Sequence, residues 1–148
     1  PRNGRPIMVE RGRIPVDAAS IVVGLDHSQG AQRALQFACA EAADKLLLVH
    51  VVIPGTARAD RRAAAAWLDD IAQRCADAHD RDARTVEARL IDGWPGPELA
   101  AVSEDADVIT VGSRGITGFR ARHLGSVATY LATHAACPVV IHHPPRHD

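Results

Sequence analysis

Apolar positions in this chain form short continuous runs that are separated by longer stretches with helical spacing. Short runs rich in Val, Ile and Leu are typical of β-strands that are buried within a sheet. Five such runs occur, at Ile21–Leu25, Leu46–Val52, Thr85–Leu90, Val108–Val111 and Pro138–Ile141. The third run alternates apolar and polar residues, which predicts a half-exposed strand at the edge of the sheet.

Between these runs, apolar residues recur every three or four positions, which predicts amphipathic helices. The predicted helices cover residues 31–42, 64–78, 95–103 and 124–135. Strand and helix therefore alternate along the chain. This order predicts an α/β fold of three layers, in which helices cover both faces of an open, parallel, five-stranded sheet.

Length and composition agree with one globular domain. The chain has 148 residues, of which 47% are hydrophobic and 24% are charged. Residues 1–19 differ from the rest, because they are rich in Pro, Gly and Arg and lack an apolar pattern. We expect a flexible N-terminal arm at 1–19, a single domain at 20–143 and a short tail at 144–148.

Charge and hydropathy exclude two classes of partner. The net charge is −1, so no basic surface for nucleic acid is expected. The longest apolar run, Leu46–Ile53, is too short to span a membrane. No secretory leader is recognisable at the N-terminus, which predicts a cytoplasmic protein.

Cysteine and histidine give only weak signals of chemistry. Cys39, Cys75 and Cys137 are odd in number and widely spaced, which is typical of buried thiols in a reducing compartment. The histidines at 142, 143 and 147 have no carboxylate or cysteine at the spacing of metal ligands, so we expect a solvated tail there and no metal site.

The glycines that follow the fourth apolar run carry the strongest functional signal. Gly112 and Gly115 come directly after that run, and Gly125-Ser126 begins the last predicted helix. Glycine allows the backbone to approach a ligand closely, and a helix N-terminus favours negative charge. The backbone N–H groups of this turn and of Gly125, Ser126 and Val127 are therefore expected to hold phosphates. No Gly-Lys-Ser/Thr follows, so the motif is not a P-loop.

Two further residues complete a candidate nucleotide site. Asp26 ends the first strand, and its carboxylate suits ribose hydroxyls or a phosphate-bound Mg²⁺. Val51, in the second strand, can offer its backbone groups to the edge of an adenine. Structural alternatives stand beside these roles: the glycines can simply shape turns, and Asp26 or Ser126 can cap a helix.

In this combination the chain resembles the ATP-binding universal stress proteins. Their motif G-x2-G-x9-G-(S/T) is matched by Gly112, Gly115, Gly125 and Ser126. Three shorter signatures also match, namely Val23-Gly24-Leu25-Asp26, His50-Val51 and Cys137-Pro138-Val139.

The resemblance implies strand order 3-2-1-4-5 and a homodimer that often pairs its last strands. It also implies an ATP site lined by eight residues: Asp26, Val51, Val111, Gly112, Gly115, Gly125, Ser126 and Val127. The chain departs from the family pattern in two respects. His27 stands where the family usually has glycine, and the N-terminal arm is longer than usual.

Three functions are compatible with these features. The first is a stress-response regulatory module that binds ATP, with Mg²⁺, and acts on an unidentified protein partner. The second is an enzyme, a slow ATPase or a protein that phosphorylates itself on Ser126 or another hydroxyl. The third is a dimerisation scaffold with an empty site. We favour the first, because phosphoryl transfer needs a positioned base and a charge clamp, and only Asp26, His27 and the loop arginines 114, 120 and 122 are at hand.

Overall fold

A computed structural model describes residues 8–10, 18–41, 43–78, 84–114 and 124–144 of the chain. The strands are β1 (Met8–Glu10), β2 (Ser20–Gly24), β3 (Lys45–Val52), β4 (Thr85–Asp92), β5 (Val108–Gly112) and β6 (Val139–His142). The helices are α1 (Gln29–Ala40), α2 (Arg58–Ala78), α3 (Pro95–Val102) and α4 (Ser126–His134), with a 3₁₀ turn at Ser103–Asp105. Each predicted strand and helix is present; α2 begins six residues before its predicted start, and the other ends differ by one or two residues at most.

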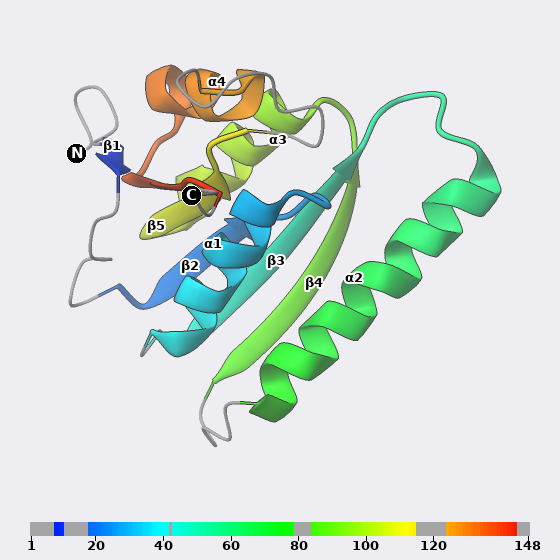
Figure 1. The fold of residues 1–148 in the computed structure, drawn as a ribbon, viewed down its shortest axis with the longest axis horizontal. Helices are drawn as coiled ribbons and strands as arrows, with labels where there is room; N and C mark the ends of the chain where they lie inside the picture. The colour runs from blue at the N-terminus through cyan, green and yellow to red at the C-terminus, as the bar shows by residue number, and fades with distance from the viewer. Residues whose placement is uncertain (1–7, 11–17, 42, 79–83, 115–123, 145–148) are drawn as a thin grey trace.

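The five predicted strands form one parallel sheet in the predicted order. Along the sheet they lie as β6-β5-β2-β3-β4, which is the order 3-2-1-4-5 when the five are counted along the chain. Every neighbouring pair is parallel. The fold class is therefore confirmed. The alternating strand β4 lies at one edge, where α2 runs beside it (Figure 1).

A sixth strand lies within the segment that was predicted to be a flexible arm. β1 pairs in parallel with β6, with Met8 beside Val139 and Glu10 beside Ile141. The prediction of an unstructured arm over 1–19 is wrong for these residues. Their contact is made with a strand more than a hundred positions away, so no local apolar pattern announces it.

Helices cover both faces of the sheet, as expected for strands that are apolar on both sides. On one face, α1 and α2 pack over a core that contains Val23, Leu46, Leu48 and Leu68. On the other face, α3 and α4 enclose a second core around Leu131 and further residues, including Val49, Ile109 and Ile141. In the described part of the chain, no helix is long and apolar enough to cross a membrane.

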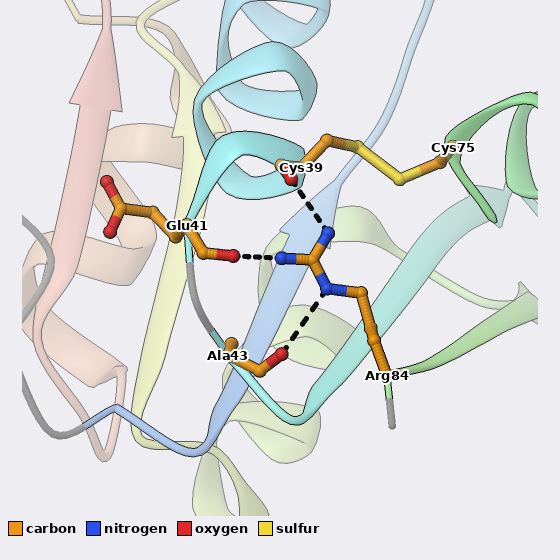
Figure 2. Close-up of a disulfide and its surroundings, with 5 residues drawn as sticks. All are labelled: Cys39, Glu41, Ala43, Cys75 and Arg84. Atoms are coloured by element: carbon orange, nitrogen blue, oxygen red, sulfur yellow. Dashed lines mark hydrogen bonds between the residues drawn. A yellow bond between two sulfur atoms is a disulfide. The ribbon is translucent and has the colours of Figure 1, made fainter. Parts of the chain in front are cut away.

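The prediction of three reduced thiols is wrong for two of the cysteines. A disulfide joins Cys39, in the last turn of α1, to Cys75, in the last turn of α2 (Figure 2). Cys137 is buried and is not part of this bond. The two bonded residues are 36 positions apart, and only the packing of the two helices brings them together.

Arg84 holds the end of α1 beside this disulfide. Its guanidinium donates hydrogen bonds to the carbonyl oxygens of Cys39, at 2.7 Å, of Ala43, at 3.3 Å, and of Glu41 (Figure 2). The last carbonyl groups of a helix lack partners within the helix and carry partial negative charge. Arg84, which precedes β4, therefore satisfies the C-terminus of α1 and fixes it against the sheet.

Candidate functional site

The candidate site lies at the carboxyl edge of the sheet, between β2 and β5. These strands are parallel neighbours, and Val23 lies beside Thr110. The segment after β2, which contains Asp26, and the segment after β5, which contains Ser113, therefore leave the sheet at the same edge. Ligands of open parallel sheets bind at this position, where successive connections run to opposite sides.

The turn after β5 is tied to both neighbouring elements. The Ser113 N–H donates to the His142 carbonyl oxygen at 2.8 Å, and the Gly125 N–H donates to the Ser113 carbonyl oxygen at 2.6 Å. The expectation that these two N–H groups hold phosphates is therefore wrong, because each already has an acceptor within the protein. Ser113 is buried, and its hydroxyl has no partner among the described residues. This residue was not singled out from the sequence, because a serine between two glycines gives no separate signal.

The N-terminus of α4 opens beside this turn. Gly125 is the N-cap, no side chain caps the helix among the residues that the structure describes, and Ser126 is its first helical residue. The alternative role of Ser126 as the N-cap is therefore wrong. Ser126 is exposed, whereas Gly125 and Val127 are half-buried. Backbone N–H groups in the first turn of a helix lack helical acceptors and suit an anion.

Asp26 lies in the loop that leads into α1. Its Oδ1 accepts a hydrogen bond from the Ser28 N–H at 2.8 Å. The N-cap of α1 is Ser28, whose hydroxyl accepts from the Ala31 N–H at 3.1 Å. Asp26 therefore stabilises the turn before the helix and does not cap Gln29 or Gly30. Among the described residues, the Ser28 N–H is the one hydrogen-bond donor recorded for the Asp26 carboxylate.

The backbone polar groups of Val51 lie on the side of β3 that faces the segment after β2. The Val49 carbonyl oxygen accepts from the Leu25 N–H at 2.8 Å, on the side of β3 that faces β2. Backbone groups two residues apart in a parallel strand point to the same side. The N–H and carbonyl groups of Val51 therefore point toward the segment that follows β2, while its side chain is buried in the core.

Gly112 has a packing role that the glycine motif did not suggest. A Cβ at this position would lie 2.8 Å from the Ala31 nitrogen and 2.9 Å from the Gly30 carbonyl carbon. A Cβ at Gly30 would in turn lie 2.8 Å from the His142 carbonyl oxygen. The two glycines allow the first turn of α1 to rest directly on the ends of β5 and β6.

The remaining predicted residues divide into two groups. Val111 is buried in the core next to Gly112, and Arg114 is half-buried at the end of the described turn. Gly115 and the candidate phosphate ligands at 120 and 122 lie outside the described residues. The complete eight-residue site therefore stays a prediction, of which seven members are placed at or beside one edge of the sheet.

A group of rings beside Asp26 was also missed as a unit. The ring of His27 lies 4.2 Å from that of Trp67, and the ring of His50 lies 5.0 Å from the same indole, measured between centroids. The His50 Nδ1 is 2.7 Å from the Leu25 carbonyl oxygen, so this histidine has the partner expected of a core residue. Trp67 shows only a helical apolar pattern in the sequence, which does not reveal its neighbours.

His142 is not part of a solvated tail, contrary to the expectation from the sequence. It ends β6, its ring lies 4.9 Å from that of Phe37, and its Nε2 is buried without a partner in the described part of the chain. The pKa of His142 is lowered from 6.5 to about 4, mainly by burial and to a smaller extent by the charges of Arg33 and His143.

Acid is therefore expected to destabilise the fold through His142. The unfolded chain takes up this proton below pH 6.5, whereas the folded chain resists until about pH 4. The contribution of the neutral His142 ring to the free energy of unfolding is fully present above pH 6.5 and is lost as the pH falls toward 4. Urea unfolding at pH 7.5 and 5.0 should show a smaller loss for His142→Leu than for the natural chain. Equal losses in both proteins would contradict this assignment.

Comparison with known proteins identifies relatives over most of the chain. The model of the family described as "Universal stress protein family" matches residues 19–143. Universal stress protein Rv3134c of Mycobacterium tuberculosis is 36% identical over 138 residues, which are 88% of this chain and 50% of that protein. Universal stress protein Rv2028c of the same organism is 35% identical over 137 residues, 86% of this chain and 49% of that protein. The chain thus spans about half the length of the curated relatives it matches.

Solved structures with the same fold include two that hold adenine nucleotides. A universal stress protein in complex with cAMP is 30% identical, with a TM-score of 0.64 over 85% of this chain and 97% of that one. A family protein from Arabidopsis thaliana with AMP bound is 20% identical, with a TM-score of 0.61 over 86% of this chain and 92% of that one. At the latter identity the likeness concerns the fold alone.

Proposed function

The chain belongs to the universal stress protein family, and from this premise we propose that it binds an adenine nucleotide, ATP with Mg²⁺, between β2 and β5. The observation that carries the proposal is the N-terminus of α4, which is capped only by Gly125 and lies beside the turn at Ser113. The related structure with cAMP supports the same class of ligand.

Each part of the nucleotide has a matching group in the site. The N–H groups of Ser126 and Val127 would hold phosphate oxygens at the start of α4, and the exposed Ser126 hydroxyl adds a further donor. The Oδ2 of Asp26 suits a ribose hydroxyl or the Mg²⁺ that accompanies the phosphates, because this ion prefers carboxylate oxygens. The backbone of Val51 would meet the edge of the base.

We place the function in stress-response regulation within the cytoplasm, where the bound nucleotide would control a protein partner. On this proposal the nucleotide is held and not hydrolysed. Steady phosphate release from ATP that Asp26→Ala abolishes would instead favour an ATPase.

The predicted homodimer is part of the proposal, but pairing of the last strands would require β1 to leave the outer edge of β6.

Substitution of Gly125 by valine tests the phosphate site. The Gly125 backbone has φ −68° and ψ 170°, which a valine can adopt, so the domain should remain folded. The added side chain should obstruct phosphate at the start of α4 and weaken ATP binding at least tenfold. Calorimetric titration with ATP, ADP and cAMP measures the effect, and thermal unfolding serves as the control for folding.

Two results would contradict the proposal. The first is an unchanged ATP affinity in folded Gly125→Val protein. The second is a natural chain that neither carries a nucleotide after purification nor binds ATP with Mg²⁺. Heat release of the bound fraction, followed by chromatography and mass measurement, identifies a nucleotide that co-purifies.

A further inference from the structure

The rings of His27, His50 and Trp67 form a cluster at the carboxyl edge of the sheet, beside Asp26. The His27 and Trp67 rings are 4.2 Å apart and tilted by 40°, and the His50 ring meets the same indole edge-on at 5.0 Å. His50 and Trp67 are half-buried, whereas His27 is exposed. The cluster therefore presents one histidine ring to solvent and supports it with a tryptophan that packs against the core.

Two contacts keep this cluster in place. The His50 Nδ1 is hydrogen-bonded to the Leu25 carbonyl oxygen at 2.7 Å, which joins β3 to the loop that carries Asp26 and His27. Trp67 precedes Leu68, one of only two buried residues in the whole of α2. The indole therefore lies next to one of the residues through which this helix packs against the sheet.

The strand order decides which part of a nucleotide would meet these rings. β2, which leads to Asp26, lies between β5 and β3. The proposed phosphate site follows β5, whereas His50 belongs to β3 and Trp67 to α2, which packs on β3 and β4. A nucleotide with its ribose at Asp26 and its phosphates at α4 therefore directs its base toward the ring cluster.

We propose that His27 is a specificity-determining residue that stacks on the base of the bound nucleotide, with Trp67 holding the imidazole in position. This inference rests on the proposed nucleotide binding. Aromatic side chains attract bases through their faces, and the contact grows with the area of the base. The two fused rings of a purine offer more area than a pyrimidine, so the site should favour purine over pyrimidine nucleotides.

Calorimetric titration of the full chain with ATP, CTP and inorganic tripolyphosphate tests this role. His27→Ala should weaken ATP binding by roughly five- to a hundred-fold, the range expected for loss of one stacking contact. CTP should lose less, and tripolyphosphate, which has no base, should bind as before. His27→Phe should retain the preference for ATP over CTP, because it keeps the ring.

A matched control and an optical readout complete the design. His134 is also exposed, and its ring stacks on that of Tyr130 at 4.0 Å. It is the last residue of α4, at the end of the helix away from the proposed phosphate site. His134→Ala should therefore leave all three affinities unchanged. In a Trp94→Phe background, Trp67 is the only tryptophan. Its emission should change when ATP binds and stay constant with tripolyphosphate.

The possible results separate this inference from the proposed function. ATP binding by the natural chain with equal ATP affinity in His27→Ala overturns the role of His27 and leaves the proposed function intact. A parallel loss of tripolyphosphate affinity also overturns it, because His27 would then serve the phosphates. If the natural chain binds neither ATP nor CTP, both the role of His27 and the proposed nucleotide binding are contradicted.

Discussion

Reduction of the Cys39–Cys75 disulfide is expected to lower the free energy of unfolding by about 4 kcal/mol. The bond closes a loop of 36 positions, and the chain entropy that such a loop removes from the unfolded state corresponds to roughly this value. A loss of this size should lower the melting temperature by about 10 °C for a chain of this length.

The structure explains why α2 should be the element most affected. Only Leu68 and Cys75 are buried in this 21-residue helix. The salt bridge from Arg61 to Asp92, at 2.8 Å, joins exposed side chains and adds little. Arg84 would still hold the end of α1 after reduction, so the reduced protein should remain folded at room temperature with a less firmly attached α2.

Thermal unfolding with and without a dithiol reductant measures the effect, and Cys39→Ser/Cys75→Ser provides the control. The reductant should lower the melting temperature of the natural chain and leave that of the double variant unchanged. Mass measurement after alkylation counts the thiols directly. Three alkylated cysteines in unreduced protein, or a melting temperature that ignores the reductant, would contradict the disulfide.

Gly112→Ala is the second substitution from which we expect a large effect, here on stability. Its methyl group would stand 2.8 Å from the Ala31 nitrogen and 2.9 Å from the Gly30 carbonyl carbon. Both are backbone atoms, so relief requires α1 to move away from β5 as a whole. Overpacking of this kind costs about 2 kcal/mol.

Gly125→Val is the matched comparison, because the two glycines belong to the same motif and the backbone angles of Gly125 can be adopted by a valine. Urea unfolding of both variants, with the disulfide intact, should show a lower midpoint for Gly112→Ala and a nearly unchanged one for Gly125→Val. ATP affinity should fall in Gly125→Val without any loss of stability. An unchanged midpoint in Gly112→Ala would mean that α1 can shift at little cost.

The sequence correctly predicted the local structure of the segments that form the candidate site. Gly125 and Ser126 begin a helix as predicted, and Asp26 follows the first predicted strand. The resemblance supplied the strand order that makes β2 and β5 neighbours. The sequence predicted only part of the role of Gly112. This residue packs against the first turn of α1, which lies about 80 residues earlier in the chain.

The order and type of the main helices and strands were determined by the sequence alone, because apolar spacing records locally which face of an element is buried. Tertiary structure decided what depends on distant segments meeting. It pairs Cys39 with Cys75, adds β1 to β6, buries His142 and places Trp67 against His27. Each of these contacts joins elements that no periodic pattern connects. They arise only when the helices dock on the sheet and bring the ends of its parallel strands to one edge.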